Sequence, residues 1–293
     1  MSTTAHTMKP LLLLVPLFII TQASNLNCGI PSIPPHQELI VGGKPARPYS
    51  WPWQAMLCSW DPDEEGAPLR EKCVLGCGGS VINDEWILTA AHCGEGDEDK
   101  THLWAVKVGL YNQHNDNEPG EQVFKVKEIH VHPNFSTPTP FSNDIALFRI
   151  DGKIKFSKTV RPICLPKSDL IHVGKSGIVT GWGDTSENGT ESDILRQVAV
   201  PFLDNRVCLG QYTTKWFDSS NQFCAGGHGV DSCQGDSGGP LVVKNRGRWW
   251  QAGIVSFGNG CGRDEFSGIY ISVKTQCEYI RSVIGKDLCR FVY

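Results

Sequence analysis

The sequence predicts an all-β fold with one helix at its C-terminal end. Of 293 residues, 31 are Gly and 18 are Pro, which favours a turn-rich β protein over a helical bundle. Short apolar runs of β type recur between turn-forming clusters such as residues 115–120, as in β-sandwiches and β-barrels. Helical spacing of apolar side chains occurs only at residues 275–288, where Tyr279, Ile280, Val283 and Ile284 fall on one face.

The expected strands follow one another without an internal repeat of fixed period. They are residues 54–57, 81–82, 86–89, 105–108, 124–129, 145–150, 177–180, 241–243, 253–256 and 268–273.

The N-terminal segment resembles a secretory signal peptide over residues 1–23. Lys9 precedes an apolar run at residues 11–20, and small residues that include Ala23 follow it. A membrane anchor is the alternative, but the run has only 10 residues and contains Pro16, whereas about 20 are needed to cross a bilayer. We therefore expect a secreted, extracellular protein without a membrane partner, with residues 24–39 as a linker or propeptide.

Cysteine content agrees with secretion. The 12 cysteines are an even number, and in a secreted chain they are expected to form disulfides. Spacing alone leaves the pairing open. The net charge of −4 gives no electrostatic footprint for nucleic acid.

Residues 231–240 carry the strongest sign of chemistry, with the sequence Asp-Ser-Cys-Gln-Gly-Asp-Ser-Gly-Gly-Pro. A serine hydroxyl such as that of Ser237 needs a base, and it needs donors for the oxyanion that develops during attack. Gly235 and Gly238 let backbone N–H groups approach a substrate carbonyl. A histidine and a carboxylate are therefore expected elsewhere in the chain.

Both partners are present, each beside an apolar strand. His92 follows the run at 86–89, and Asp144 directly precedes the run at 145–150, so the chain order is His, Asp, Ser. With these motifs, residues 40 to about 283 resemble the trypsin/chymotrypsin family of secreted serine endopeptidases. The resemblance implies a chymotrypsin-like peptidase domain at 40–293, with two packed six-stranded antiparallel β-barrels at about 40–160 and 165–274 and a C-terminal helix at about 275–288.

The resemblance also implies roles for the site residues. Ser237 is the nucleophile, His92 the general base, and Asp144 orients the histidine. The N–H groups of Gly235 and Ser237 form the oxyanion hole. No cofactor is expected.

The resemblance implies that the residue six positions before the nucleophile, here Asp231, sets the substrate preference. A buried carboxylate there selects Arg or Lys, although a solvated loop aspartate is the plainer alternative. The resemblance adds Gly258 and Gly268 as pocket walls and Ser256 as a contact for substrate backbone, with Ser232 beside Asp231. Phe141 and Phe257 have two interpretations of equal weight: they form apolar subsites beside the cleft, or they are ordinary core aromatics.

The resemblance also implies a zymogen that is activated by cleavage before Ile40, which frees an α-amino group to pair with Asp236. The residue before that bond is Leu39, and no Lys or Arg lies in residues 25–39. A protease with Asp231 in its pocket should not cut there. An activating protease of chymotrypsin or elastase type is therefore an expected partner.

The resemblance proposes four disulfides, and we expect the remaining four cysteines to pair locally, with crossed pairing as the alternative. The pairs are Cys28–Cys164, Cys77–Cys93, Cys208–Cys224 and Cys233–Cys261 by resemblance, and Cys58–Cys73 and Cys277–Cys289 by proximity.

Several further motifs have competing interpretations. Two acidic runs either are solvated loops or lie at the cleft and favour basic substrate residues after the cut bond. They are Asp61, Asp63, Glu64 and Glu65, and Glu95, Asp97, Glu98 and Asp99. No metal is expected. Some members of the family that the chain resembles have a calcium loop, in which Glu121 matches one acidic ligand but Leu110 stands at the other position, and His130 and His132 lack a third zinc ligand. Asn134 and Asn188 begin glycosylation sequons.

The sequence therefore predicts a secreted serine endopeptidase that cleaves protein or peptide substrates after Arg or Lys. Protein inhibitors are further expected partners. The alternative is a catalytically silent homologue that acts as an extracellular binding module, which only the Leu39 junction favours. A disulfide-rich structural domain would leave His92, Asp144 and Ser237 unexplained.

Overall fold

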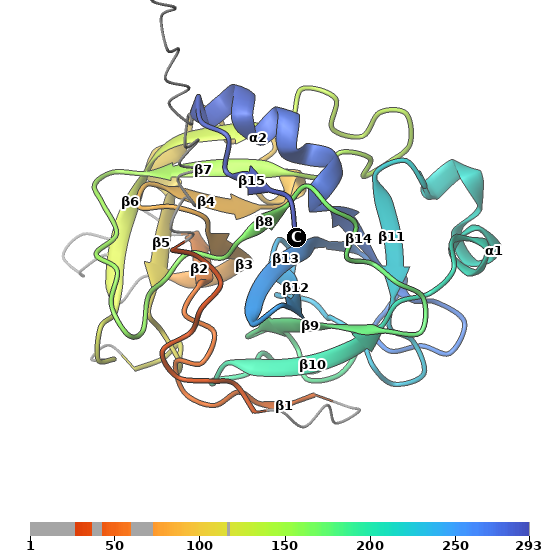
Figure 1. The fold of residues 1–293 in the computed structure, drawn as a ribbon, viewed down its shortest axis with the longest axis horizontal. Helices are drawn as coiled ribbons and strands as arrows, with labels where there is room; N and C mark the ends of the chain where they lie inside the picture. The colour runs from red at the N-terminus through yellow and green to blue at the C-terminus, as the bar shows by residue number, and fades with distance from the viewer. Residues whose placement is uncertain (1–26, 37–42, 60–72, 116–117, 293) are drawn as a thin grey trace, which may run out of the picture.

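The computed structural model describes residues 27–36, 43–59, 73–115 and 118–292. Two β units lie side by side, with the C-terminal helix across one end (Figure 1). Several predictions fall outside the described residues: the signal peptide, Leu39, Ile40, and the acidic run from Asp61 to Glu65.

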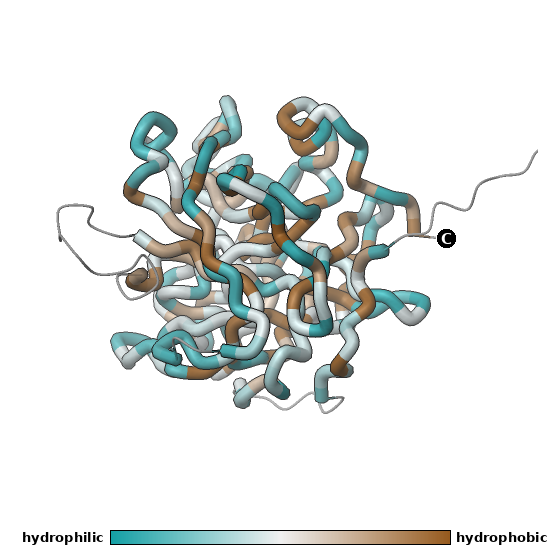
Figure 2. Tube along the Cα trace, turned by 90° about the vertical axis from the view of Figure 1, so that its left-hand side faces the viewer, coloured by the Kyte–Doolittle hydropathy of each residue, from teal (hydrophilic) through white to brown (hydrophobic). Residues whose placement is uncertain are grey.

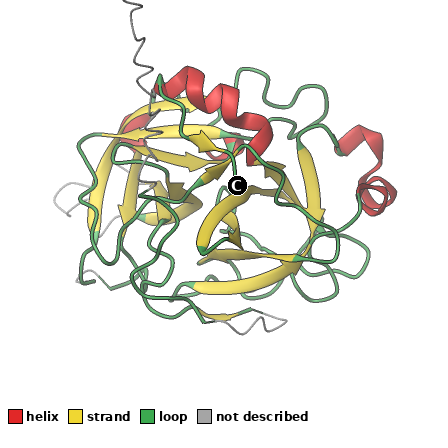
Figure 3. Ribbon diagram, in the orientation of Figure 1, coloured by secondary structure: helices red, strands yellow, loops and turns green. Residues whose placement is uncertain are grey.

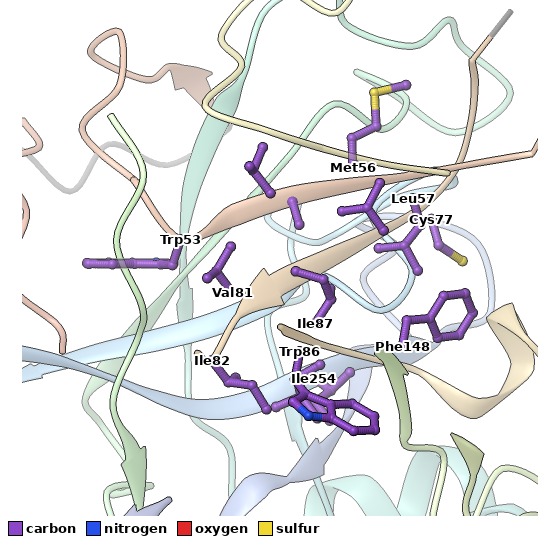
Figure 4. Packing of buried hydrophobic residues seen from close by; sticks show 14 of the residues in the cluster. Trp53, Met56, Leu57, Cys77, Val81, Ile82, Trp86, Ile87, Phe148 and Ile254 are labelled. Carbon is purple, nitrogen blue, oxygen red and sulfur yellow. The ribbon is translucent and has the colours of Figure 1, made fainter. Parts of the chain in front are cut away.

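The N-terminal unit is a closed six-stranded barrel in the order β2-β3-β4-β7-β6-β5. Its strands are β2 (Gln54–Ser59), β3 (Val74–Val81), β4 (Trp86–Thr89), β5 (Trp104–Val108), β6 (Gln122–Val131) and β7 (Ala146–Ile150). Leu57, Ile87 and Phe148 are fully buried inside it (Figure 4). Gly79 is required there, because a Cβ atom would lie 2.6 Å from Leu57 Cδ1 and 2.8 Å from Ile87 Cγ2.

The C-terminal unit is a curled seven-stranded sheet in the order β1-β10-β9-β12-β13-β14-β11. Its strands are β1 (Lys44–Pro45), β9 (Ser176–Gly181), β10 (Arg196–Pro201), β11 (Gln222–Ala225), β12 (Pro240–Asn245), β13 (Arg248–Phe257) and β14 (Gly268–Ser272). A bridge between Phe202 and Ala225 joins the β10 side to β11, and Gly226 N–H donates to Pro201 O at 3.0 Å. The sheet thus curls toward a second barrel of six strands, to which β1 adds an edge. The predicted chymotrypsin-like all-β fold is confirmed.

Buried hydrogen bonds fix the two units against each other. Ser80 Oγ donates to Gln251 Oε1 at 2.6 Å, and Thr180 Oγ1 donates to Gln54 Oε1 at 2.6 Å. All four side chains are buried, so these hydrogen bonds replace solvation that the polar groups lose on folding. Satisfied buried polar pairs of this kind rigidify the arrangement of the two units.

The C-terminal helix is α2 (Cys277–Ile284), preceded by a 3₁₀ turn η3 (Val273–Gln276). It is shorter than the predicted 275–288 because Gly285 ends it in the left-handed conformation, with φ of 73°. Tyr279 and Ile280 pack into the core. The short strands β8 (Leu165–Pro166) and β15 (Cys289–Arg290) pair in parallel and fasten the tail.

A second helix, α1 (Asn205–Trp216), contradicts the prediction of a single helical segment (Figure 3). Its only buried residues are Cys208 and Tyr212, so it has no apolar stripe for the periodicity to reveal. The Asp204 side chain caps it by accepting a hydrogen bond from Arg206 N–H, and Thr213 interrupts it with φ of 59°. In Figure 1 it lies at the outer edge of the C-terminal unit, and Figure 2 shows hydrophilic loops around a hydrophobic interior.

All twelve cysteines form disulfides, and none is free. The six pairs are those proposed above: Cys28–Cys164, Cys58–Cys73, Cys77–Cys93, Cys208–Cys224, Cys233–Cys261 and Cys277–Cys289. Among the described residues, no helix has the length and apolar character needed to cross a bilayer.

Candidate active site

Neighbouring strands bring His92 and Asp144 together. His92 lies in a 3₁₀ turn, η1 (Ala91–Cys93), just after β4, and Asp144 lies just before β7. These strands pair with Thr89 opposite Ala146, so the two side chains emerge at the same edge of the barrel. His92 Nδ1 lies 2.7 Å from Asp144 Oδ2, and the His92 backbone N–H donates to Oδ1 at 2.9 Å.

The Asp144 carboxylate is fully buried and fully satisfied. Besides the two contacts with His92, its Oδ2 accepts a hydrogen bond from Ser256 Oγ at 2.5 Å. The resemblance had assigned Ser256 to substrate backbone, and the structure adds this contact with Asp144. Three donors hold the carboxylate, so its oxygens keep a fixed direction toward the imidazole.

The environment of His92 raises its pKa above 6.5. Burial lowers the pKa, but the charge and hydrogen bond of Asp144 outweigh burial, and the charge of Glu95 raises the pKa further. Only the unprotonated imidazole can accept a proton, so the role expected of His92 as a base predicts that activity falls as the pH drops through this raised value.

We expect the acid limb of the pH profile of kcat/KM to have its midpoint above pH 6.5. Glu95→Gln removes one of the charges that raise the His92 pKa, so the midpoint should move about 0.3 units lower. Hydrolysis rates from pH 5 to 9 test both statements. A midpoint that Glu95→Gln leaves unchanged would contradict the contribution of Glu95.

The loop around Ser237 is held by both units. Gly78 N–H, from β3, donates to Ser237 O at 2.7 Å, and Gly238 N–H donates to Val255 O in β13 at 2.9 Å. Gly238 has φ of 76°, and a Cβ there would lie 2.1 Å from Thr89 Oγ1. Only glycine therefore allows Ser237 to approach the barrel that carries His92.

Ser237 and His92 line one cavity of about 260 Å³ with Asp231, Ser256, Phe257, Gly258 and Gly268. Asp231 is held by the N–H groups of Ser232, at 2.9 Å, and of Gly262, at 3.2 Å. Burial raises the pKa of Asp231 to about 7, although these N–H donors lower it. A cation in this cavity would favour the charged carboxylate.

The glycines in the pocket keep the Asp231 carboxylate accessible. A Cβ at Gly268 would lie 2.5 Å from Asp231 Oδ1, so a side chain there would cover the charge. Gly258 borders the same cavity. Ser232 Oγ lies 3.2 Å from Tyr270 OH, a contact that sequence reasoning did not predict.

Asp236 faces a second cavity, of about 280 Å³, which Gly43, Gly181 and Gly183 also line. Its carboxylate accepts hydrogen bonds from Gly183 N–H at 3.0 Å and Cys233 N–H at 2.9 Å. Burial raises the pKa of Asp236 to about 6, and the two N–H donors lower it. This cavity can take a positively charged group.

Phe141 and Phe257 form an apolar wall beside His92. Their rings stack with centroids 4.9 Å apart, and Phe141 meets the His92 ring edge-on at 5.9 Å. Both residues are half-buried and line the cavity that contains Ser237. They therefore lie at the cleft, as the first of the two interpretations proposed.

Other predicted residues lie outside this constellation. Asn134 and Asn188 are exposed, and His130 contacts Glu128 at 2.9 Å. Among the described residues, the only group with metal-ligand spacing is Cys77, His92 and Cys93, whose cysteines are joined in a disulfide. The structure thus brings together the residues predicted for catalysis and for the pocket.

Comparison with known proteins agrees with this geometry. The sequence profile described as Trypsin matches residues 40–280. This chain belongs to the trypsin family. It is also similar to mouse and rat vitamin K-dependent protein C, each 38% identical over 258 residues, which cover 84% of this chain and 52% of the relative. The chain spans about half the length of these relatives. The predicted family is confirmed.

Proposed function

We propose that this protein is a secreted serine endopeptidase that cleaves after Arg or Lys, and that it is made as a zymogen. The supporting observation is that Asp231, Ser237 and His92 line one cavity while Asp144 holds His92 from behind. A peptide whose basic side chain enters the cavity toward Asp231 then presents its carbonyl near Ser237.

The mechanism follows from these positions. His92 accepts the Ser237 hydroxyl proton as oxygen attacks the carbonyl, and later returns that proton to the leaving amine. Asp144 keeps Nδ1 of His92 protonated and stabilises the imidazolium. The N–H groups of Gly235 and Ser237 stabilise the oxyanion, with about 3–4 kcal/mol for each donor.

The Asp236 cavity supports activation by cleavage before Ile40. Gly43 lines this cavity and follows Ile40 by three residues, so a new α-amino group has only a short path to Asp236. The amine and the carboxylate would each gain a counter-ion, which offsets the cost of burying Asp236. Pairing raises the pKa of the amine above its reference value of about 8. The active form is therefore lost as the pH rises through this raised pKa.

One experiment tests the proposed function. The full chain is cleaved at the Leu39–Ile40 bond by an apolar-specific protease, the new terminus is verified by mass, and Arg, Lys, Leu and Phe peptides are assayed. Turnover of Arg and Lys peptides that Ser237→Ala abolishes is expected. Absence of Ser237-dependent turnover would favour the silent binding module instead, and cleavage of Phe but not Arg peptides would contradict the Asp231 pocket.

The Leu39 junction predicts that the zymogen does not activate itself. A pocket with Asp231 at its floor disfavours an apolar side chain, because the buried carboxylate would lack a partner. Incubation of purified full chain, alone or with the cleaved enzyme, should therefore leave Leu39–Ile40 intact. The matched variant Leu39→Arg should instead be cut by the active enzyme. Formation of an Ile40 terminus in the unaltered chain by its own activity would contradict this prediction.

A further inference from the structure

The loop that leads into Asp144 has a strained backbone. Ser136, Phe141 and Asn143 have positive φ angles of 57°, 60° and 53°, although none is glycine. Residues held in this region cost about 1–3 kcal/mol each and persist only where surrounding contacts fix them. The loop must therefore be held by specific contacts.

Some of those contacts lie within the loop, as between Asn143 Nδ2 and Thr137 O at 3.0 Å, and others come from the C-terminal unit. Gln222 Nε2, at the start of β11, donates to Phe141 O at 2.9 Å. Asn143 N–H donates to Asn221 Oδ1 at 3.5 Å, and Asn143 Oδ1 accepts from Gln276 Nε2 at 3.2 Å. The segment 218–222, between α1 and β11, thus forms hydrogen bonds with both Phe141 and Asn143.

Asp218 is the centre of this contact. Its Oδ2 accepts hydrogen bonds from the Ser142 hydroxyl at 3.1 Å and from Asn221 Nδ2 at 2.8 Å. Its Oδ1 accepts from Ser220 N–H at 3.0 Å and Ser220 Oγ at 2.6 Å. Ser142 is fully buried, so loss of Asp218 would leave its hydroxyl with hydrogen bonds to Thr139 of the same loop only, at 2.8 Å from Thr139 Oγ1. The Asp218 carboxylate therefore adds a link between the strained loop and segment 218–222 to those made by Asn221 and Gln222.

We propose that Asp218 is a positioning residue for substrate specificity, acting through Phe141. Asp218 contacts Ser142, the residue after Phe141, and by fixing this backbone it would hold the Phe141 ring, which is stacked on Phe257 and edge-on to His92. This inference rests on the proposed function. When the basic side chain of a substrate lies at Asp231 and its carbonyl at Ser237, the substrate residue before the basic one lies against Phe141. If the Phe141 ring is fixed, it favours an apolar substrate side chain at that preceding position. A glycine at the same substrate position has no side chain to contact the ring, so its binding should not depend on Phe141.

The test is Asp218→Ala in the chain cleaved before Ile40, with two peptides that present Leu-Arg or Gly-Arg before the cut bond. KM for the Leu-Arg peptide should rise about tenfold with kcat within about twofold, and both constants for the Gly-Arg peptide should stay within about twofold. In a Phe141→Ala background, Asp218→Ala should add nothing, because its effect passes through that ring. Equal losses on both peptides, or full additivity with Phe141→Ala, would overturn the proposal.

Asp204→Ala is the matched control, because Asp204 is also a hydrogen-bonded carboxylate but caps the opposite end of α1. It should not separate the two peptides. Hydrogen exchange of residues 132–144 in the uncleaved chain should be faster in Asp218→Ala than in Asp204→Ala, and equal rates would also overturn the proposal. This measurement needs no turnover. If the unaltered enzyme cleaves neither peptide, the proposed function fails, while hydrogen exchange still decides whether Asp218 holds the loop.

Discussion

Asp144→Asn should lower kcat about 10,000-fold near neutral pH while the fold stays intact. Asp144 has two oxygens in use: Oδ1 accepts the His92 backbone N–H, and Oδ2 accepts from His92 Nδ1 and Ser256 Oγ. An amide offers one oxygen and one NH₂ group. If its oxygen keeps the backbone contact, the NH₂ group faces Nδ1, which then must be unprotonated. His92 Nε2 would then carry the proton and could not accept the one from Ser237.

The measurement is single-turnover hydrolysis of an Arg peptide by the cleaved enzyme, with circular dichroism to verify the fold. Ser256→Ala is the matched control, since it removes one donor to Asp144 and leaves the carboxylate. It should cost about tenfold, the value of one hydrogen bond to a charged group. An Asp144→Asn enzyme that loses less than the Ser256→Ala enzyme would show that the orientation of His92 does not limit catalysis.

The barrel strands could be predicted because each has a local signal. The runs at 54–57, 86–89 and 145–150 lie within or overlap β2, β4 and β7, all almost wholly buried. Strands that are buried on both faces appear in the sequence as short continuous apolar segments, so their positions can be recognised without the structure. The motif around Ser237 could also be recognised from the sequence, because the close packing of the local backbone requires glycine at positions such as Gly238.

Features that depend on contacts distant in the chain were not predictable. Helix α1 has no apolar face because only Cys208 and Tyr212 turn inward. Asp218 has no motif of its own, and its partner Ser142 lies 76 residues away. The hydrogen bond from Ser256 to Asp144 spans 112 residues. Single residues in such networks show no spacing or composition that distinguishes them from ordinary surface polar residues.

Asp231→Asn should have two opposite effects, a loss of activity and a gain in stability. For Arg peptides, kcat/KM should fall about 1,000-fold, because a buried cation would lose its counter-ion. Phe and Leu peptides gain nothing from the charge, so their low rates should change little. Kinetics on the same four peptides in the cleaved enzyme measure this change of preference.

The stability effect follows from proton linkage in the uncleaved chain. The folded pKa of Asp231 is raised to about 7, whereas an unfolded Asp titrates near 4. Between these values the folded state binds more protons than the unfolded state, so its stability falls as pH rises. Asn carries no charge to bury. Asp231→Asn should therefore be more stable by about 2–4 kcal/mol at pH 8, and this advantage should vanish toward pH 4.

Asp264→Asn is the matched control for both effects, because Asp264 follows Gly262 by two residues but is 77% exposed. It should change neither the preference for Arg nor the pH dependence of unfolding. Urea unfolding of each variant at pH 4, 6 and 8 makes the comparison. If Asp231→Asn lost Arg cleavage without the gain at pH 8, Asp231 would bind the cation from a well-solvated position. If it gained stability but kept Arg cleavage, the carboxylate would be buried but would not be the group that recognises the substrate. Only both effects together fit a carboxylate whose burial is unfavourable until a basic side chain enters.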